Sequence, residues 1–447
     1  MNLLGRFRSI IENLKPGFIL MIPVFLGCET SDNPGIQYEL DSDANVEFVE
    51  FTLPTTSIYI DSLRTDGEDR VIAGTYNDDI GGQISAEGYF AISYESGPLP
   101  KETGGSDTLE IDSIIFSLES LESTPLSSQF NQELDIYTLS DSLISSAVYL
   151  SGTELSKEEL IGSFTKTVNP DDTINVFHSK LSAGFEREFF NTISNIAGDQ
   201  DLLISTYVFK SFGITSGNSS EGLSLFDLAS DTSRIYLYTS PIDTKDTTYV
   251  TSFTVGKKNF TYLDRSASIV GGLDDDTEIS NIPAVKDPLY GITPKFSINE
   301  LADFFGANKE IILNNATFTF SFESETPRDT LENFYTFFYA NNGYNASGLV
   351  SSPFTSLVMS DAAFLQGQSS PALSRINDEN TEIIQSATLF FQTLYLDYIE
   401  TGSFNIPNSE DNPFTEFILL NQNEVSLQRS VFGAEGIKLR IYYTEVN

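Results

Sequence analysis

Residues 109–119 read Leu109-Glu110-Ile111-Asp112-Ser113-Ile114-Ile115-Phe116-Ser117-Leu118-Glu119. Apolar and polar side chains alternate along most of this stretch, as in a β-strand with one face in a core. The central apolar run from Ile114 to Phe116 indicates that part of both faces is covered. This is the strongest strand signal in the first half of the chain, and it predicts a fold built on packed β-sheets.

Weaker strand patterns lie on both sides of this stretch. Residues 46–51 alternate apolar and acidic side chains, and residues 70–76 lead into a turn at Gly81 and Gly82. Glycine adopts the positive φ values that tight turns require. Because Gly, Pro and Asn separate many short strand patterns, the sequence predicts a sandwich or jelly-roll topology. Further strands are expected at residues 57–63, 134–139, 202–209 and 233–239.

Three segments have helical patterns instead. Residues 185–196 place four apolar side chains on one helical face, at spacings of four, four and three. Residues 296–305 predict a short helix that the side chain of Asn299 can cap, because it can accept the free amide hydrogens of the first turn. Residues 155–161 fit one or two helical turns.

The second half of the chain follows the outline of the first. Residues 313–323 resemble residues 111–119, and the closing strand at 436–444 matches the one at 233–239. Residues 384–391 have the same strand-like outline. The two halves are therefore interpreted as related β-sandwich domains.

The predicted fold class is all-β with a few short helices, in two tandem jelly-roll-like antiparallel β-sandwich domains. The boundary is expected at Pro241, because proline interrupts a strand. The domains are then residues 48–240 and 241–447, behind an N-terminal tether.

The N-terminal segment has the layout of a secretory signal. A basic region precedes an apolar run at residues 18–26, and Gly27 stands directly before Cys28, the only cysteine of the chain. Val24-Phe25-Leu26-Gly27-Cys28 resembles the lipobox of bacterial lipoproteins. The resemblance implies that residues 1–27 are removed as a signal peptide and that Cys28 is lipidated. Residues 28–47 then form a flexible tether. The alternative is a buried cysteine after an uncleaved apolar helix, although the run is about half of the ~20 residues that span a bilayer.

The composition excludes several kinds of chemistry. The chain carries 64 acidic and 24 basic residues, a formal charge of −40. Such a surface repels nucleic acid and anionic membranes. With one cysteine and one histidine, disulfides and Cys- or His-rich metal sites are excluded. His178 can in principle act as a general base, but its alternating context predicts a surface histidine.

Four segments resemble an uncharacterised family of Bacteroidota lipoproteins that is known only as a domain of unknown function. They are residues 72–82, the strand Ile111-Asp112-Ser113-Ile114, residues 207–214 with Phe212-Gly213, and residues 438–444. The first half also looks like the jelly-roll modules found beside polysaccharide-degrading enzymes, which bind carbohydrate. The resemblance implies a surface lipoprotein that covers an outer-membrane barrel, in nutrient import or in protein insertion and export. Thr30-Ser31-Asp32 behind Glu29 resembles the acidic tag that sends such lipoproteins to the cell surface.

Three acidic clusters are candidate Ca²⁺ sites, because Ca²⁺ takes six to eight oxygen ligands. None of them fits the spacing of an EF-hand loop, and the alternative is a solvated turn. Paired carboxylates for glycoside hydrolysis are a further alternative with little support in so acidic a chain. The clusters are Asn77-Asp78-Asp79, Asp171-Asp172 and Asp274-Asp275-Asp276.

An aromatic stretch gives candidate binding residues. Alternation places Tyr335, Phe337 and Tyr339 on one strand face, and Tyr344 lies on the Gly-Asn loop that follows. Exposed tyrosines stack on sugars or anchor protein partners. The alternative is that these rings fill the sandwich core.

Together these patterns predict a non-enzymatic, lipid-anchored outer-membrane protein, exposed at the cell surface or on the periplasmic face. We expect an accessory subunit of an outer-membrane β-barrel complex, such as protein insertion or export machinery, which contacts the barrel and other surface lipoproteins. The alternative is a glycan-binding lipoprotein of a nutrient-uptake system. It ranks second because the chain has no Trp, the commonest sugar-stacking side chain. An enzyme is the third function considered. No cofactor is expected beyond a possible Ca²⁺, and the bilayer is contacted through Cys28.

Overall fold

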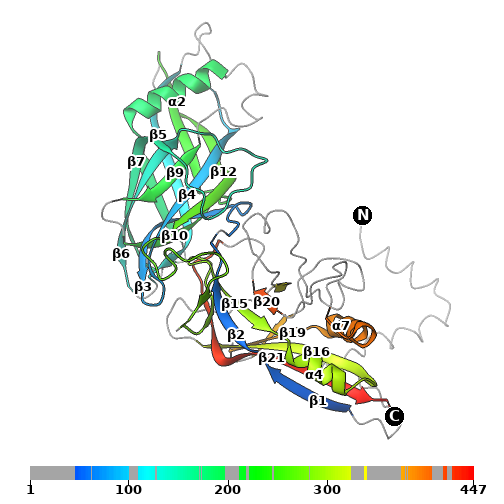
Figure 1. Ribbon diagram of the computed structural model, residues 1–447. Coiled ribbons are helices and arrows are strands. Elements are labelled where there is room, and N and C mark those ends of the chain that lie inside the picture. The colour runs from blue at the N-terminus through cyan, green and yellow to red at the C-terminus, as the bar shows by residue number, and fades with distance from the viewer. Residues whose placement is uncertain are drawn as a thin grey trace, which may run out of the picture. The chain divides into compact units, whose positions relative to one another are not determined.

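The computed structural model of the chain is built mainly from antiparallel β-strands (Figure 1). Three α-helices accompany them in the described part of the chain. The expectation of an all-β fold with a few short helices is therefore confirmed. The structure describes residues 46–446 except 62, 100–108, 126–127, 171, 173, 197–210, 218–220, 244–245, 281, 324–336, 340–373, 378, 380, 405–415, 420–424 and some side chains.

The first sheet has ten strands and is organised around β5 (Leu109–Thr124), the strand that contains the opening stretch. On one side β5 pairs with β11 and β10, and on the other side it pairs with β8. A further pairing of β12 with β4 joins two strands that are not neighbours in the main order. The other strands are β3 (Arg70–Asp78), β4 (Gly82–Ser96), β6 (Phe130–Leu139), β7 (Lys157–Val168), β8 (Asn175–Lys180), β9 (Phe212–Ser216), β10 (Gly222–Asp227), β11 (Arg234–Pro241) and β12 (Tyr249–Asp264).

The inner faces of these strands enclose an aromatic core. Phe116 of β5 is fully buried, with its ring centroid 5.6 Å from that of Phe90 and 5.3 Å from that of Phe164. Helix α2 (Ala183–Ile196) adds its apolar face to the same core through Phe185 and Phe189. The helix predicted at residues 185–196 is thus confirmed.

The helical turn predicted at residues 155–161 is wrong. Most of that segment belongs to β7, where Leu160 lies opposite Tyr137 of β6. The local pattern was compatible with a helix, but pairing with β6 satisfies the backbone hydrogen bonds of the segment as a strand. Tertiary context overrides weak helix propensity in this way.

The ten-stranded sheet and α2 form one group of elements, and two smaller sheets with two helices form a second group. Helices α4 and α7 and the five-stranded sheet share a core with one face of the six-stranded sheet, through residues such as Phe305, Phe391, Phe296 and Phe318. The six-stranded sheet consists of β1 (Val46–Thr52), β14 (Ala284–Lys286), β16 (Ile311–Glu323), β18 (Ser374–Ile376), β19 (Glu382–Ser386) and β21 (Ser430–Glu445). The five-stranded sheet consists of β2 (Thr55–Tyr59), β13 (Glu278–Ile279), β15 (Ile292–Ser297), β17 (Phe337–Tyr339) and β20 (Glu416–Leu419). The helices are α4 (Glu300–Ala307) and α7 (Thr388–Thr401).

The predicted division into residues 48–240 and 241–447 is wrong. β1 pairs with β21, and β2 pairs with β15, so the first two strands belong to the second group. β12 lies beyond the predicted boundary, yet it pairs with β11 and β4 of the ten-stranded sheet. Pro241 is the last residue of β11, opposite Leu109. Strands find partners through backbone hydrogen bonds across a sheet, and that choice does not follow chain order.

The tether and two local predictions also need correction. Val46 and Glu47 already pair with β21, so β1 begins two residues before the predicted domain start at residue 48. The strand expected at 384–391 ends at Ser386, and helix α7 begins at Thr388. Asn299 occupies the N-cap position of α4, but its side chain makes no cap bond.

Glu122 of β5 offers a test of the electrostatics of the first sheet. Burial raises the pKa of this carboxyl, and the positive charge of Arg70 opposes the shift only in part. The folded state therefore binds a proton more tightly than the unfolded state, so ionised Glu122 destabilises the fold at neutral pH. We expect Glu122→Gln to raise the Tm at pH 7, and the gain to fade as the pH falls to about 4, where the unfolded state is also protonated.

Thermal unfolding at pH 4 and pH 7 measures this effect. Glu310→Gln, at an exposed position before β16, is the matched control and should leave the Tm unchanged. A gain at pH 4 as large as the gain at pH 7 would contradict the assigned role of the Glu122 charge.

Candidate functional site

The predicted aromatic site falls largely outside the described residues. Tyr335 and Tyr344 lie there, as does Cys28. Tyr339 is the last residue of β17 and is opposite Phe417 of β20, and its side chain is outside the described part. Those three tyrosines stay predictions.

The acidic cluster at residues 77–79 is not a Ca²⁺ site of the predicted kind. The carboxylate of Asp78 is buried, and its Oδ1 accepts hydrogen bonds from Arg429 at 3.0 Å and from the N–H groups of Ile80 and Gly81 at 2.9 Å each. Asp79 is exposed beside it. Asp78 thus forms the turn and holds a buried cation of its own chain, which leaves this carboxylate little capacity for a metal ion.

Of the predicted Asp171-Asp172 cluster, Asp171 lies outside the described residues and Asp172 is exposed. The cluster at residues 274–276 forms a turn. Asp275 Oδ1 accepts a hydrogen bond from the N–H of Asp61 at 3.0 Å, and Asp276, at φ 63°, has its Oδ1 3.9 Å from Nζ of Lys295. Asp274 is exposed, and burial raises the pKa of both Asp275 and Asp276. Within the described ranges, no three His, Cys, Asp or Glu side chains are grouped closely enough to hold a metal ion. The predicted Ca²⁺ ligands are therefore not brought together there.

The single histidine lies where the alternating pattern places it. His178 is exposed on β8, and Phe177 beside it is buried in the core. The prediction of a surface histidine is confirmed.

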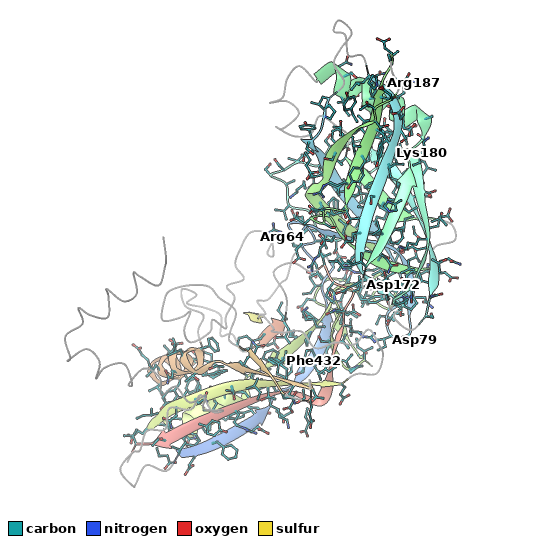
Figure 2. The ribbon with its side chains drawn as sticks, turned by 180° about the vertical axis from the view of Figure 1, so that it is seen from behind. Arg64, Asp79, Asp172, Lys180, Arg187 and Phe432 are labelled. Carbon is teal, nitrogen blue, oxygen red and sulfur yellow. The ribbon has the colours of Figure 1, made fainter. Side chains whose placement is uncertain are left out.

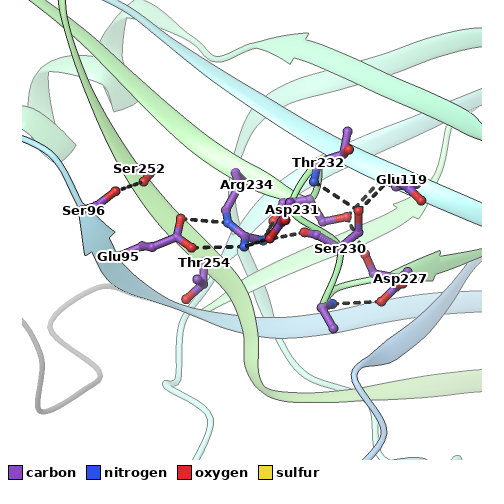
Figure 3. A network of polar contacts seen from close by, with 12 residues as sticks. Glu95, Ser96, Glu119, Asp227, Ser230, Asp231, Thr232, Arg234, Ser252 and Thr254 are labelled. Carbon is purple, nitrogen blue, oxygen red and sulfur yellow. Dashed lines mark hydrogen bonds and ion pairs between the residues drawn. The ribbon is translucent and has the colours of Figure 1, made fainter. Parts of the chain in front are cut away.

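A dense polar network surrounds Arg234 at the start of β11 (Figure 3). Its guanidinium donates to both carboxylate oxygens of Glu95, at 2.9 and 3.1 Å, and to Asp231 Oδ1 at 3.2 Å. The hydrogen bond from Arg234 lowers the pKa of Glu95. Ser230 extends the network by donating to Glu119 at 2.6 Å. These groups satisfy one another's hydrogen-bonding capacity and stabilise the connection between β10 and β11. The network therefore has a structural role.

The six-stranded sheet presents a different kind of surface, which we call the open face. It consists of the outward-facing side chains of β1, β21 and β16, on the side opposite α4, α7 and the five-stranded sheet. Figure 1 shows β1, β21 and β16 side by side in this sheet. Registers place Phe48 opposite Tyr442 and Val46 opposite Thr444, which in turn is opposite Ile312.

One corner of the open face is apolar. Phe48 is 62% exposed, Ile312 56% and Val46 55%. The ring of Phe48 lies 5.8 Å from the ring of Tyr442, which is half-buried. Exposed apolar side chains that gather in this way mark interaction sites more often than scattered ones do.

A row of charged side chains borders this corner. Arg440 donates to Glu50 Oε2 through Nε at 2.9 Å and through Nη2 at 2.5 Å. Its guanidinium carbon also lies 5.7 Å from the ring centroid of Phe48, in cation–π range. Lys438 lies 3.8 Å from Glu50 and 3.1 Å from Glu435. The open face thus combines an aromatic corner with an adjoining row of positively and negatively charged side chains.

Sequence reasoning identified β1 as a strand but missed the open face. The alternation in residues 46–51 offers two faces, one with Phe48 and one with Val49 and Phe51. Val49 and Phe51 turn toward the core, and Phe48 turns outward. Both faces contain apolar residues, so the alternation did not reveal which face would be covered.

Along the described part of the chain, no helix has the length and apolar character needed to cross a bilayer. No family model matches the chain. No curated protein matches it either. Among solved structures, one described as a "putative secreted protein" from Parabacteroides distasonis ATCC 8503 matches with a TM-score of 0.18 and 9% identity. That match covers 88% of this chain and all of the other, and similarity this low identifies no common fold.

Proposed function

We propose that this chain is a non-catalytic, lipid-anchored protein of the outer membrane that docks on a membrane protein partner through the open face. The partner class is an outer-membrane β-barrel complex, such as protein insertion or export machinery. Cys28 is the anchor, and the chain acts as an accessory subunit at the cell surface.

The observation that carries this proposal is the apolar corner bordered by the Arg440–Glu50 row. Interfaces between proteins are enriched in aromatic residues and Arg at their centre, within a polar rim. Phe48, Tyr442 and Arg440 supply these residue types on adjacent strands. Because the same sheet buries its other face against α4 and α7, the strands that present these side chains are held rigidly, which lowers the entropic cost of binding.

The position of β1 in the chain supports a partner at the membrane. If Cys28 carries the lipid, residues 28–45 link the bilayer to Val46, and a chain of that length spans at most about 60 Å. The apolar corner begins at Val46 itself. It therefore stays within reach of a protein embedded in the same membrane.

Replacing Phe48 with Ser is expected to release the partner. The protein, tagged after residue 447, is extracted from membranes with mild detergent, and co-purifying proteins are identified by mass spectrometry. The wild type should retain a stoichiometric barrel protein, and Phe48→Ser should lose most of it, because truncating an aromatic anchor typically costs about 2 kcal/mol or more, roughly 30-fold in affinity.

Leu396→Ser is the matched control, because Leu396 is 66% exposed on α7, which covers the opposite face of the sheet. It should leave the partner bound. Recovery of the wild-type protein alone, or equal loss of the partner from both variants, would disprove docking through the open face.

A further inference from the structure

β7 and β8 follow one another in the chain, yet they do not pair. β7 pairs with β6, and β8 pairs with β5, so each is an edge strand of the ten-stranded sheet that faces the other. Between them lies an open hollow of about 580 Å³, within the usual range for small-ligand sites.

The hollow is bounded at both ends by hydrogen bonds. At one end the N–H of Ser182 donates to the carbonyl oxygen of Ile161 at 2.6 Å. Toward the other end Nζ of Lys166 donates to the carbonyl oxygen of Val176 at 2.9 Å, and it lies over the ring of Phe177. These bonds tie the two edges to each other on both sides of the hollow.

The lining has a composition unlike the rest of the chain. It contains no Asp or Glu, although acidic residues outnumber basic ones by 64 to 24. The acidic residues nearest along β7, Glu158 and Glu159, lie outside it. The lining residues are Leu160, Ile161, Gly162, Ser163, Thr165, His178, Ser179, Lys180, Leu181 and Ser182.

The donors of the hollow remain available for a ligand. His178 and Lys180 are exposed, and within the described part of the chain their side chains have no hydrogen-bond or ion-pair partner (Lys180 is labelled in Figure 2). Ser163 and Thr165 add exposed hydroxyl groups on the facing strand. Ser182 Oγ accepts from the N–H of Phe185 at 3.3 Å and keeps its own O–H to donate.

We propose that this hollow binds an acidic sugar residue of a polysaccharide, with its carboxylate on Lys180 and His178. The hydroxyl groups of Ser163, Thr165 and Ser182 match the hydroxyl groups of a sugar ring. Leu160, which is 51% exposed, offers apolar surface to the C–H face of the ring. A neutral apolar ligand would leave the lysine unused, and a phosphate or sulfate would leave the apolar wall unused.

The floor of the hollow depends on Gly162. A Cβ at this position would lie 3.1 Å from both the Leu181 side chain and Ser179 Oγ. A larger side chain there fills the space that the ligand requires. Gly162→Val therefore provides a blocking variant that keeps the Lys180 and His178 side chains in the sequence.

Isothermal titration calorimetry of the full-length protein tests the proposal with trigalacturonate as the probe. We expect weak binding, with a Kd of about 0.1–1 mM, as is usual for a shallow site. Lys180→Ala should weaken it at least ~10-fold, because a hydrogen bond to a charged group is lost. Gly162→Val should abolish it, with thermal unfolding of both variants checked first.

Lys309→Ala is the matched control, because it removes the same charge at an exposed position before β16, and its affinity should equal that of the wild type. The methyl ester of trigalacturonate should not bind, since it lacks the carboxylates. Equal binding of acid and ester, an unchanged affinity in Lys180→Ala, or no heat at about 10 mM probe would overturn the proposal. Equal binding of the tripeptide Gly-Gly-Gly would overturn the sugar assignment, because a bare carboxylate would then suffice.

Discussion

Replacing Asp78 with Ala is expected to lower the free energy of unfolding by about 3–5 kcal/mol, the usual cost of removing one partner of a buried ion pair. The side chains of Asp78 and Arg429 are 5% and 1% exposed. Without the carboxylate, the guanidinium remains in an interior where water cannot replace that partner. The N–H groups of Ile80 and Gly81 also lose their acceptor, so the turn between β3 and β4 is weakened as well.

The effect is large because this pair joins distant parts of the chain. Asp78 and Arg429 are 351 residues apart, and the ring of Tyr290 is fully buried beside the same turn, where its hydroxyl donates to the carbonyl oxygen of Gly82 at 2.7 Å. Chemical denaturation monitored by circular dichroism gives the free energy of unfolding. The Asp78–Arg429 pair thus ties the turn between β3 and β4 to the residue directly before β21.

Glu50→Ala is the matched control for Asp78→Ala. It breaks the ion pair of Glu50 with Arg440, whose side chains are 32% and 45% exposed, and exposed pairs contribute about 0–1 kcal/mol. We therefore expect a small effect from Glu50→Ala and a large one from Asp78→Ala. Similar losses in the two variants would show that the burial of the Asp78–Arg429 pair has no energetic consequence.

Replacing Phe116 with Ala is expected to cost about 3–5 kcal/mol, because it removes a large side chain from a close-packed core and leaves a cavity. Phe116 is fully buried on β5, in ring contact with Phe90 of β4 and Phe164 of β7. Its ring therefore holds three strands of the ten-stranded sheet against one another. The midpoint of urea unfolding should fall accordingly.

Ile144→Ala is the control for this core substitution. Ile144 is 60% exposed in the loop after β6, so its truncation should change the free energy of unfolding by less than about 0.5 kcal/mol. A loss of similar size in Ile144→Ala and Phe116→Ala would contradict the assignment of Phe116 to the centre of the core. A smaller loss in Phe116→Leu than in Phe116→Ala would support packing as the cause, because leucine leaves less of the cavity empty.

Secondary structure was predictable where the local pattern was strong. The alternation in residues 109–119 identified β5, and the apolar face at residues 185–196 identified α2. The prediction failed at residues 155–161 and 384–391, two short segments whose mixture of apolar and polar residues fits both helix and strand. There the neighbours decided the outcome: β6 pairs with β7, and α7 contributes to the core beneath β16.

The candidate site was less predictable than the fold. Asp78 was identified as part of an acidic cluster that could bind Ca²⁺. Its actual partner, Arg429, lies 351 residues further along the chain, and the sequence contains no sign of the pairing. His178 was identified as a surface residue, but the hollow beside it exists because β7 and β8 pair with β6 and β5 instead of with each other. Neither the Asp78–Arg429 pair nor the hollow between β7 and β8 produces a recognisable pattern in the local sequence.

The sequence by itself determined the all-β class, the main strands and the helix α2, because periodicity along the chain reports which residues share a face. Tertiary structure alone decided that β1 and β2 join the C-terminal sheets, that Phe48 faces outward and that Asp78 is buried. The reason is physical: a strand of alternating residues always has two faces, and the choice of which one is covered belongs to the elements that pack against it.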